Sequence, residues 1–220
     1  MIQAVIFDMD GLLIDTEPEW QKMEREFVIK MGIEITPELQ KLTLGLRSIE
    51  LIQFWHHFKP WPNPDFEKTE KEFDQIMKKY YINEASLMNG ALQVLYFFKL
   101  RKIKMALASS SPMMLIDTFL EKFELESFFE VKHSAEYEEY GKPHPSVYIT
   151  TAKKLGIPPS FCLAFEDSFN GLLAAKSARM KAVVVPELSH FSEERFAIAE
   201  MKLKSLEEFG EKEFDFICGN

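Results

Sequence analysis

The sequence predicts an α/β fold: a doubly wound, mostly parallel sheet with an inserted helical cap domain. Two observations lead to this prediction. Short apolar segments, each bounded by polar or turn residues, recur along the chain with helical patterns between them, an alternation typical of a parallel sheet covered by helices. Residues 16–86 interrupt this alternation and contain no convincing strand pattern, which indicates a separate helical insert.

Strands are expected at the short apolar segments, because strands buried on both faces of a parallel sheet are almost wholly apolar. The four clearest segments are residues 2–7, 103–108, 160–165 and 180–185. Residues 127–134 predict another short strand, and residues 199–205 predict a weaker edge strand.

Helices are expected between these strands, at residues 111–125, 144–157 and 168–180. Three residues fit the ends of these helices. Pro145 suits a first turn, Gly156 suits a C-terminal cap and Ser168 suits an N-terminal cap.

The inserted segment is predicted to consist of several helices. Residues 19–32, 48–58 and 65–81 have helical patterns, and the proline-rich "KPWPNP" separates the last two, because proline cannot continue a helix. We therefore expect residues 1–15 and 87–220 to form the α/β core domain and residues 16–86 to form the cap domain.

Composition favours a cytoplasmic protein that binds neither nucleic acid nor membranes. With 46% hydrophobic residues in a chain of 220, a sizeable core needs no disulfide, and Cys162 and Cys218 fit a reducing compartment. The first apolar run meets Asp8 too early for a secretory signal, and no stretch is long and apolar enough to span a membrane. The net charge of −9 argues against partners that need a basic face.

Polar and charged side chains gather at the carboxyl ends of the predicted strands, where parallel α/β sheets bind their ligands. They are Asp8 and Asp10 after the first strand, Ser109 and Ser110 after the strand at 103–108, Lys142 before a helix, and Glu166 and Asp167 after the strand at 160–165. We expect them to lie at one edge of the sheet.

This set fits a phosphate site. Asp8, Asp10 and Asp167 offer hard oxygen ligands that suit Mg²⁺, and a cation would relieve the repulsion between two carboxylates only one residue apart. Ser109 can donate a hydroxyl hydrogen bond, and Lys142 can balance negative charge in the transition state. Asp8, at the strand tip, is the better-fixed nucleophile, while Asp10 can move a proton.

Four motifs occur in order along the chain: "DMDGLLIDTE" at 8–17, "LASSS" at 107–111, "GKPHP" at 141–145 and "EDSFNG" at 166–171. Together they resemble the haloacid dehalogenase (HAD) superfamily, more narrowly its β-phosphoglucomutase-like branch of sugar phosphatases. The match runs through essentially the whole chain, including the helical insert. It implies the Rossmann-like core of that superfamily and a Mg²⁺-dependent phosphatase.

The resemblance also implies roles for the motif residues. Asp8 would form a phosphoaspartyl intermediate, and Asp10 would act first as general acid and then as general base. Ser109, Ser110 and Lys142 would bind the phosphate.

The resemblance further implies that Asp8, the backbone carbonyl of Asp10 and Asp167 hold Mg²⁺, with Glu166 assisting through water. The expected partner is a small phosphorylated metabolite, and the protein is expected to be a monomer.

Substrate choice is expected to depend on the cap. The stretches "GLLIDTEPEW", "TLGLR" and "KPW" resemble bacterial hexitol-phosphate and 2-deoxyglucose-6-phosphate phosphatases, which implies a sugar or sugar-alcohol phosphate as substrate. In related enzymes the segment at 42–48 carries specificity residues. The candidate specificity residues are Thr16, Glu17 and Trp20 near the cap hinge, with Gly45 and Arg47 in that segment.

Three other functions share parts of this residue set. A β-phosphoglucomutase-like mutase shares every core residue, but mutases resembling this branch carry histidine where this chain has Trp20. A 2-haloacid dehalogenase needs no metal and usually lacks the second aspartate, here Asp10. A non-enzymatic phosphoaspartate switch of the response-regulator kind is much shorter and has no helical insert, so a phosphatase is the leading interpretation.

Overall fold

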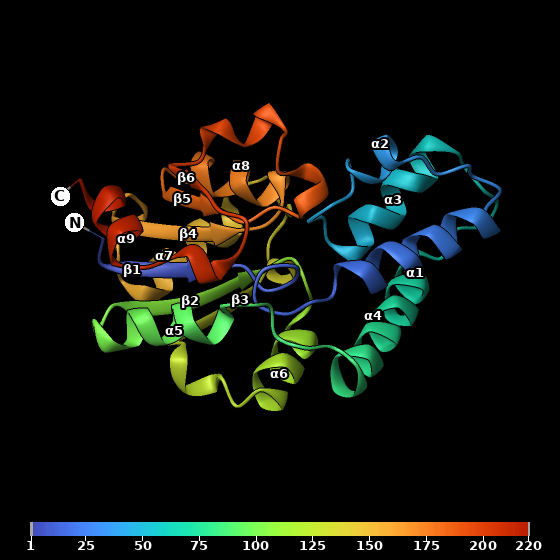
Figure 1. Ribbon diagram of the computed structural model, residues 1–220. Helices are drawn as coiled ribbons and strands as arrows, with labels where there is room; N and C mark the ends of the chain where they lie inside the picture. The colour runs from blue at the N-terminus through green and yellow to red at the C-terminus, as the bar shows by residue number, and fades with distance from the viewer. Residues whose placement is uncertain (1, 220) are drawn as a thin grey trace.

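The computed structural model describes residues 2–219, and within that range the chain forms one six-stranded sheet with helices around it (Figure 1). The strands are β1 Ala4–Phe7, β2 Lys104–Ser109, β3 Val131–Ser134, β4 Cys162–Glu166, β5 Lys181–Val184 and β6 Met201–Lys202. The α-helices are α1 Glu17–Lys30, α2 Pro37–Gln40, α3 Ser48–Phe58, α4 Phe66–Asn83, α5 Ala91–Leu100, α6 Met113–Lys122, α7 Ser146–Leu155, α8 Phe169–Ser177 and α9 Glu211–Cys218. The fold class predicted from the sequence is confirmed.

Every strand pairs in parallel, in the order β3-β2-β1-β4-β5-β6. The central strand is therefore β1, with β2 on one side and β4 on the other. In this register Phe7 lies opposite both Leu107 and Phe165. The three strands consequently end together, and the side chains that follow them meet at one edge of the sheet.

Both faces of the sheet are buried, as the almost wholly apolar strand segments predict. Val5 and Phe7 belong to a cluster that includes residues of α5 and α6, while Ile6 and Ala106 belong to a second cluster with α7 and α8. Figure 1 shows α5 below the sheet and α8 above it. Alternate residues of a strand therefore pack against the helices on opposite faces of the sheet.

All six predicted strands are present, although the edge strand β6 is only two residues long. Gly156 ends α7 in the left-handed conformation, and Ser168 caps α8 by accepting the Gly171 N–H, both as predicted. Pro145 differs from its prediction: it lies one residue before α7 rather than in its first turn.

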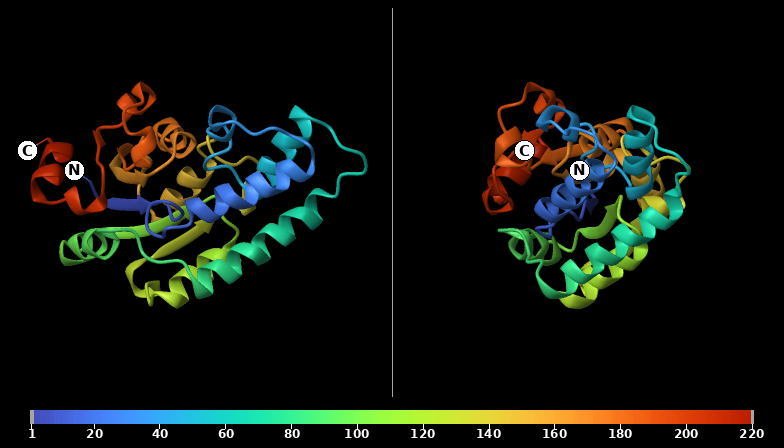
Figure 2. Two further views of the ribbon diagram at one scale, coloured as in Figure 1. Left: turned by 45° about the vertical axis from the view of Figure 1, so that its right-hand side comes forward. Right: turned by 90° about the vertical axis from the view of Figure 1, so that its right-hand side faces the viewer.

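Helices α1–α4 lie together beyond the carboxyl edge of the sheet, and Figure 2 shows α1 and α4 beside each other there. No strand falls between β1 and α5, in agreement with the expected helical insert; Ile14 and Leu87 form only an isolated bridge. The division into a core domain and a cap domain at 16–86 stays a prediction. No helix among residues 2–219 has the length and apolar character needed to cross a membrane.

Candidate active site

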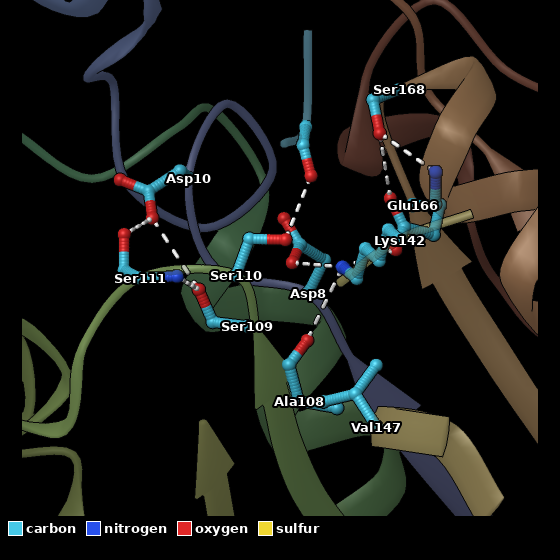
Figure 3. A network of polar contacts seen from close by, with 12 residues as sticks. Asp8, Asp10, Ala108, Ser109, Ser110, Ser111, Lys142, Val147, Glu166 and Ser168 are labelled. Atoms are coloured by element: carbon cyan, nitrogen blue, oxygen red, sulfur yellow. Dashed lines mark hydrogen bonds and ion pairs between the residues drawn. The ribbon is translucent and has the colours of Figure 1, made fainter. Parts of the chain in front are cut away.

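Asp8 directly follows β1 and is buried. Its backbone N–H donates to the Phe165 carbonyl at 3.0 Å, so the pairing of β1 with β4 extends to this residue. Lys142 Nζ lies 2.6 Å from Asp8 Oδ1 and 2.6 Å from Glu166 Oε1 (Figure 3). The lysine charge is therefore shared by carboxylates from two neighbouring strands.

Lys142 is held as a cation in spite of its burial, with only 2% of its surface exposed. Burial alone would lower the pKa of Lys142, but the charges of Asp8 and Glu166 outweigh it and raise the pKa above the ordinary value. The ammonium group also reaches the Ala108 carbonyl at 3.4 Å, and the Tyr148 hydroxyl donates to Glu166 Oε1. These contacts fix a positive charge at the carboxyl edge of β1.

Three carboxylates converge beside this lysine. One oxygen each from Asp8, Glu166 and Asp167 lies within 4.8 Å of the others. Burial raises the pKa of Asp8 against the opposing effect of Lys142, and burial together with the charge of Glu17 raises the pKa of Asp167. Three converging carboxylates, two of which contact Lys142, are a donor set that Mg²⁺ fits.

Gly11 allows the loop after Asp10 to pass directly beside Asp167. Its φ of +71° lies in the left-handed region, and a Cβ at this position would overlap the Asp167 carboxylate. The Gly11 N–H donates to the Ile14 carbonyl at 2.9 Å, which closes the turn. The glycine therefore brings the two acidic segments together.

The Asp10 carboxylate lies outside this three-carboxylate cluster and accepts hydrogen bonds from both the cap helices and the core. On Oδ1 the donors are Thr16 Oγ1 at 2.7 Å, Trp20 Nε1 at 3.3 Å and the Tyr81 hydroxyl; on Oδ2 they are Ser111 Oγ at 2.7 Å and Ser109 Oγ at 3.5 Å. Burial and the Asp10 charge raise the pKa of Tyr81, so its hydroxyl keeps its proton and donates. Tyr81 comes from α4, which ties Asp10 to the helical insert.

A cavity lies between the carboxyl edge of the sheet and the cap helices. From the core it is lined by Asp8, Asp10, Ser109, Ser110, Lys142 and Asp167, among others. From the insert it is lined by Glu17, Trp20, Gln21, Glu24, Thr43 and Gly45, among others. The structure thus brings nearly all of the predicted site residues together at one cavity. Glu166 lies behind it, bound to Lys142, and is fully buried.

Ser109 and Ser110, predicted to bind phosphate, reach the cavity wall by different contacts. The Ser109 hydroxyl accepts the Ser111 N–H at 3.0 Å, and the Ser110 hydroxyl donates to the Gly45 carbonyl at 2.7 Å. Their role toward phosphate stays a prediction. Ser110 also helps to hold the cap segment against the core.

The segment around Gly45 lies against the core motifs. Asn170 Nδ2 donates to the Leu44 carbonyl at 2.8 Å, next to the bond from Ser110. Gly45 has a φ of +77°, and a Cβ there would come within 2.5 Å of Ser168 Oγ. A glycine is therefore needed for this close approach of the insert to the start of α8.

Arg47 is not among the residues that line this cavity, and its role as a specificity residue stays a prediction. Its guanidinium donates to three backbone carbonyls of the core, those of Ala135 at 3.2 Å, Glu138 at 2.9 Å and Glu139 at 3.3 Å. Arg47 Nη2 also lies 2.6 Å from Glu50 Oε1, which accepts the Gly141 N–H at 2.8 Å. We call these contacts the Arg47–Glu50 bridge, and it ends at the residue before Lys142.

Sequence reasoning did not identify Tyr81, Tyr148 or Glu50 as site residues. Each reaches the site from an element distant in sequence, so no local pattern distinguishes it from an ordinary helix or loop residue. Ser111 lies in the "LASSS" motif, but the sequence analysis gave it no role. Thr16, a candidate specificity residue, is fully buried, and its hydroxyl donates to Asp10; its role in specificity stays a prediction.

Comparison with known proteins identifies a matching family and similar curated proteins. The haloacid dehalogenase-like hydrolase family matches residues 2–179. Hexitol phosphatase B of Escherichia coli (strain K12) is 37% identical over 214 residues, which cover 96% of each chain.

Two solved structures are similar as well. A CbbY variant from Rhodobacter sphaeroides, crystallised in complex with xylulose-(1,5)bisphosphate, has a TM-score of 0.79 and 27% identity, covering 96% of this chain and 97% of that one. A β-phosphoglucomutase from Clostridium difficile has a TM-score of 0.82 and 23% identity, covering 100% and 98%, and shows the same fold.

Proposed function

The chain belongs to the haloacid dehalogenase-like hydrolases, and on that premise we propose that it is a Mg²⁺-dependent phosphatase of a small sugar or sugar-alcohol phosphate. The observation that carries the proposal is the pair of acids at the carboxyl end of β1. Asp8 is fixed by Lys142, while Asp10 is held separately by hydroxyl and indole donors, and both line one cavity.

In the first step Asp8 attacks phosphorus. The bond from phosphorus to the sugar oxygen breaks, and Asp10 gives its proton to that oxygen as it leaves. Lys142 balances the negative charge of the phosphate during transfer, because it is held as a cation within 2.6 Å of Asp8. The product of this step is an aspartyl phosphate and a free sugar or sugar alcohol.

In the second step water replaces Asp8 on phosphorus. Asp10, now ionised, takes a proton from the attacking water, and the bond between Asp8 and phosphorus breaks to release inorganic phosphate. The donors on Asp10 hold its carboxylate at the cavity wall, where it can serve both steps.

Asp8, Asp167 and Glu166 would hold Mg²⁺, since oxygens of the three carboxylates converge. Lys142 offsets only part of their negative charge. When bound, the ion supplies positive charge that draws a phosphate oxygen toward Asp8 and lowers the repulsion between the two anions. We also propose that the enzyme is cytoplasmic, as its composition indicates, and that it acts as a monomer.

Chelation of divalent cations with EDTA should lower phosphate release by roughly 10²-fold or more, because an anionic nucleophile would then meet an anionic phosphate without the ion's charge. The measurement is phosphate release from a panel of hexitol, hexose, pentose and nucleotide monophosphates, before and after chelation and after Mg²⁺ is restored. Undiminished release in EDTA would contradict the proposed ion. Conversion of β-glucose 1-phosphate to glucose 6-phosphate without phosphate release would favour a mutase instead.

The insert is proposed to close over the cavity and exclude water during the reaction. The Arg47–Glu50 bridge supports this role, because it joins α3 to the core segment that immediately precedes Lys142. Closing the cap would therefore complete hydrogen bonds beside the phosphate-binding lysine.

Arg47→Ala is expected to lower kcat/KM by about 10- to 100-fold, since it removes charge-assisted hydrogen bonds made to the core. The exposed pair of Lys68 and Glu72 on α4 offers a matched control, and Lys68→Ala should leave kcat/KM nearly unchanged. Steady-state kinetics with thermal unfolding of both variants makes the comparison. If the two variants have equal kcat/KM, the Arg47–Glu50 bridge has no role in closing the cap.

A further inference from the structure

Tyr81 lies in the last turn of α4 and holds Asp10 from the side of the insert. Its side chain is fully buried, and its hydroxyl donates to Asp10 Oδ1, beside the bonds from Thr16 and Trp20. Tyr81 is not among the residues that line the active-site cavity. Its hydroxyl is therefore placed to act on the reaction through Asp10 and not by touching the substrate.

The position of the Tyr81 hydroxyl depends on the backbone of α4. The phenol oxygen lies at the end of a rigid ring with two rotatable bonds, and the ring is packed on all sides. The oxygen cannot move far unless the helix moves. Whatever fixes the end of α4 therefore also fixes the hydrogen bond to Asp10.

A lysine of the core holds this end of α4. Lys122 is the last residue of α6, and its Nζ donates to the backbone carbonyls of Tyr81 and Ala85, at 2.6 Å in each case. The last four carbonyls of a helix have no partner within the helix, and a cation there also suits the helix dipole. Since α4 ends at Asn83, Tyr81 is one of those four residues. Lys122 thus binds the backbone of the residue whose hydroxyl holds Asp10.

The two ends of α4 are attached to different parts of the molecule. Phe73 packs edge-to-face against Phe27 of α1, with ring centroids 5.3 Å apart. Tyr81 follows two turns later, about 12 Å along the helix, and there α4 lies beside α6 (Figure 2). Within the described residues, both side-chain hydrogen bonds of Lys122 go to this end of the insert. Tyr81 therefore lies where α4 is tied to the core.

We propose that Tyr81 is a positioning residue for Asp10, and that Lys122 keeps it in place by binding the end of α4 to the core. The inference rests on the proposed phosphatase function and gives roles to two residues outside the cavity. Asp10 has to give a proton to the leaving oxygen and then take one from water, so it must stay within hydrogen-bonding reach of both. Loss of the Tyr81 hydroxyl should therefore slow the steps that transfer a proton.

Tyr81→Phe removes only the hydroxyl. For sorbitol 6-phosphate, a sugar-alcohol monophosphate, we expect kcat to fall about 10- to 50-fold, the scale of one hydrogen bond to a charged group, while KM stays within about threefold. Nitrophenolate release from p-nitrophenyl phosphate in the first turnover should stay within about threefold, because that leaving group needs no proton. Tyr80→Phe is the matched control, since its hydroxyl lies 3.5 Å from the Asp15 carbonyl, and it should leave these values unchanged.

Combination with Asp10→Asn distinguishes positioning from a general structural role. If Tyr81 acts through Asp10, adding Tyr81→Phe to Asp10→Asn should change kcat for sorbitol 6-phosphate by less than about twofold. A damaged fold would lower kcat in both backgrounds. A loss that persists in full in the Asp10→Asn background would therefore overturn the positioning role.

Lys122→Met keeps most of the side-chain length and removes both hydrogen bonds to the end of α4. We expect kcat for sorbitol 6-phosphate to fall about 5- to 10-fold, and by less than about twofold when Tyr81 is already Phe. Lys122→Arg should keep most of the activity, because a guanidinium can donate to both carbonyls. Lys79→Met, at an exposed position of α4, is the matched control and should leave kcat unchanged.

Unchanged kcat in Tyr81→Phe would overturn the inference, as would equal losses in kcat and in first-turnover nitrophenolate release. Losses that multiply when Lys122→Met and Tyr81→Phe are combined would overturn the role of Lys122. If Tyr81→Phe does not fold, Lys122→Met compared with Lys122→Arg still decides, and equal kcat in those two variants contradicts the inference. All these results would leave the proposed phosphatase function standing. That function fails if the unmodified protein releases phosphate from neither substrate in the presence of Mg²⁺.

Discussion

Asp8→Asn is expected to abolish phosphate release, with kcat lower by about 10⁵- to 10⁶-fold, the scale measured when other enzymes lose a nucleophile. An amide has nearly the shape of the carboxylate, so the cavity keeps its form. It cannot form an acyl phosphate, however, and it offers Lys142 no negative charge at the 2.6 Å contact. The measurement is phosphate release from sorbitol 6-phosphate under saturating Mg²⁺.

The matched control for this variant is Asp117→Asn, which makes the same change at an exposed residue of α6 that is paired with Lys132 at 2.9 Å. It should retain full activity. Circular dichroism and thermal unfolding should show both variants folded, since Glu166 still pairs with Lys142 in Asp8→Asn. If Asp8→Asn keeps more than about one per cent of the original turnover rate, Asp8 is not the nucleophile.

Asp10→Asn has the second largest expected effect, a loss of about 10²- to 10⁴-fold in kcat for sugar-alcohol phosphates, the usual range for a positioned acid–base group. The amide keeps the size of the side chain, and its single oxygen can still accept one of the two 2.7 Å bonds that Thr16 and Ser111 make to Asp10. The amide, however, has no acidic proton to give to the departing sugar oxygen.

The leaving group distinguishes this loss from a structural defect. p-Nitrophenolate leaves without a proton, so Asp10→Asn should release it in the first turnover far faster than it releases a sugar alcohol. Thr16→Val removes one hydrogen bond to Asp10 without removing the acid, and should cost much less activity. Equal losses for both leaving groups in the first turnover would argue against Asp10 as the general acid.

The core of the site could be predicted because strand ends are visible in the sequence. Apolar segments stop at Asp8, Ser109 and Glu166, and parallel pairing in register brings these ends to one edge. Lys142 is not on a strand, so its place at this edge could be expected only from its position immediately before a predicted helix. The structure brings it there over a separation of 134 residues.

The contacts between the insert and the core could not be predicted in the same way. Tyr81 reaches Asp10 across 71 residues, and Glu50 reaches Gly141 across 91 residues. Such pairs depend on how α3 and α4 lie against the core, which hydrophobic periodicity within each helix does not determine. Arg47 illustrates the difficulty: its place in the predicted specificity segment gave no indication that its guanidinium binds core carbonyls.

Trapping the phosphoryl group on Asp8 tests the central claim most directly. In Asp10→Asn, p-nitrophenyl phosphate should phosphorylate Asp8 without acid assistance, and the missing general base should then slow attack by water. We expect a burst of about one nitrophenolate per protein molecule, and acid quenching followed by peptide mass spectrometry should find one phosphoryl group on the peptide that contains Asp8. Steady nitrophenolate release with no phosphoryl group on that peptide, or a phosphoryl group on another residue, would contradict the account.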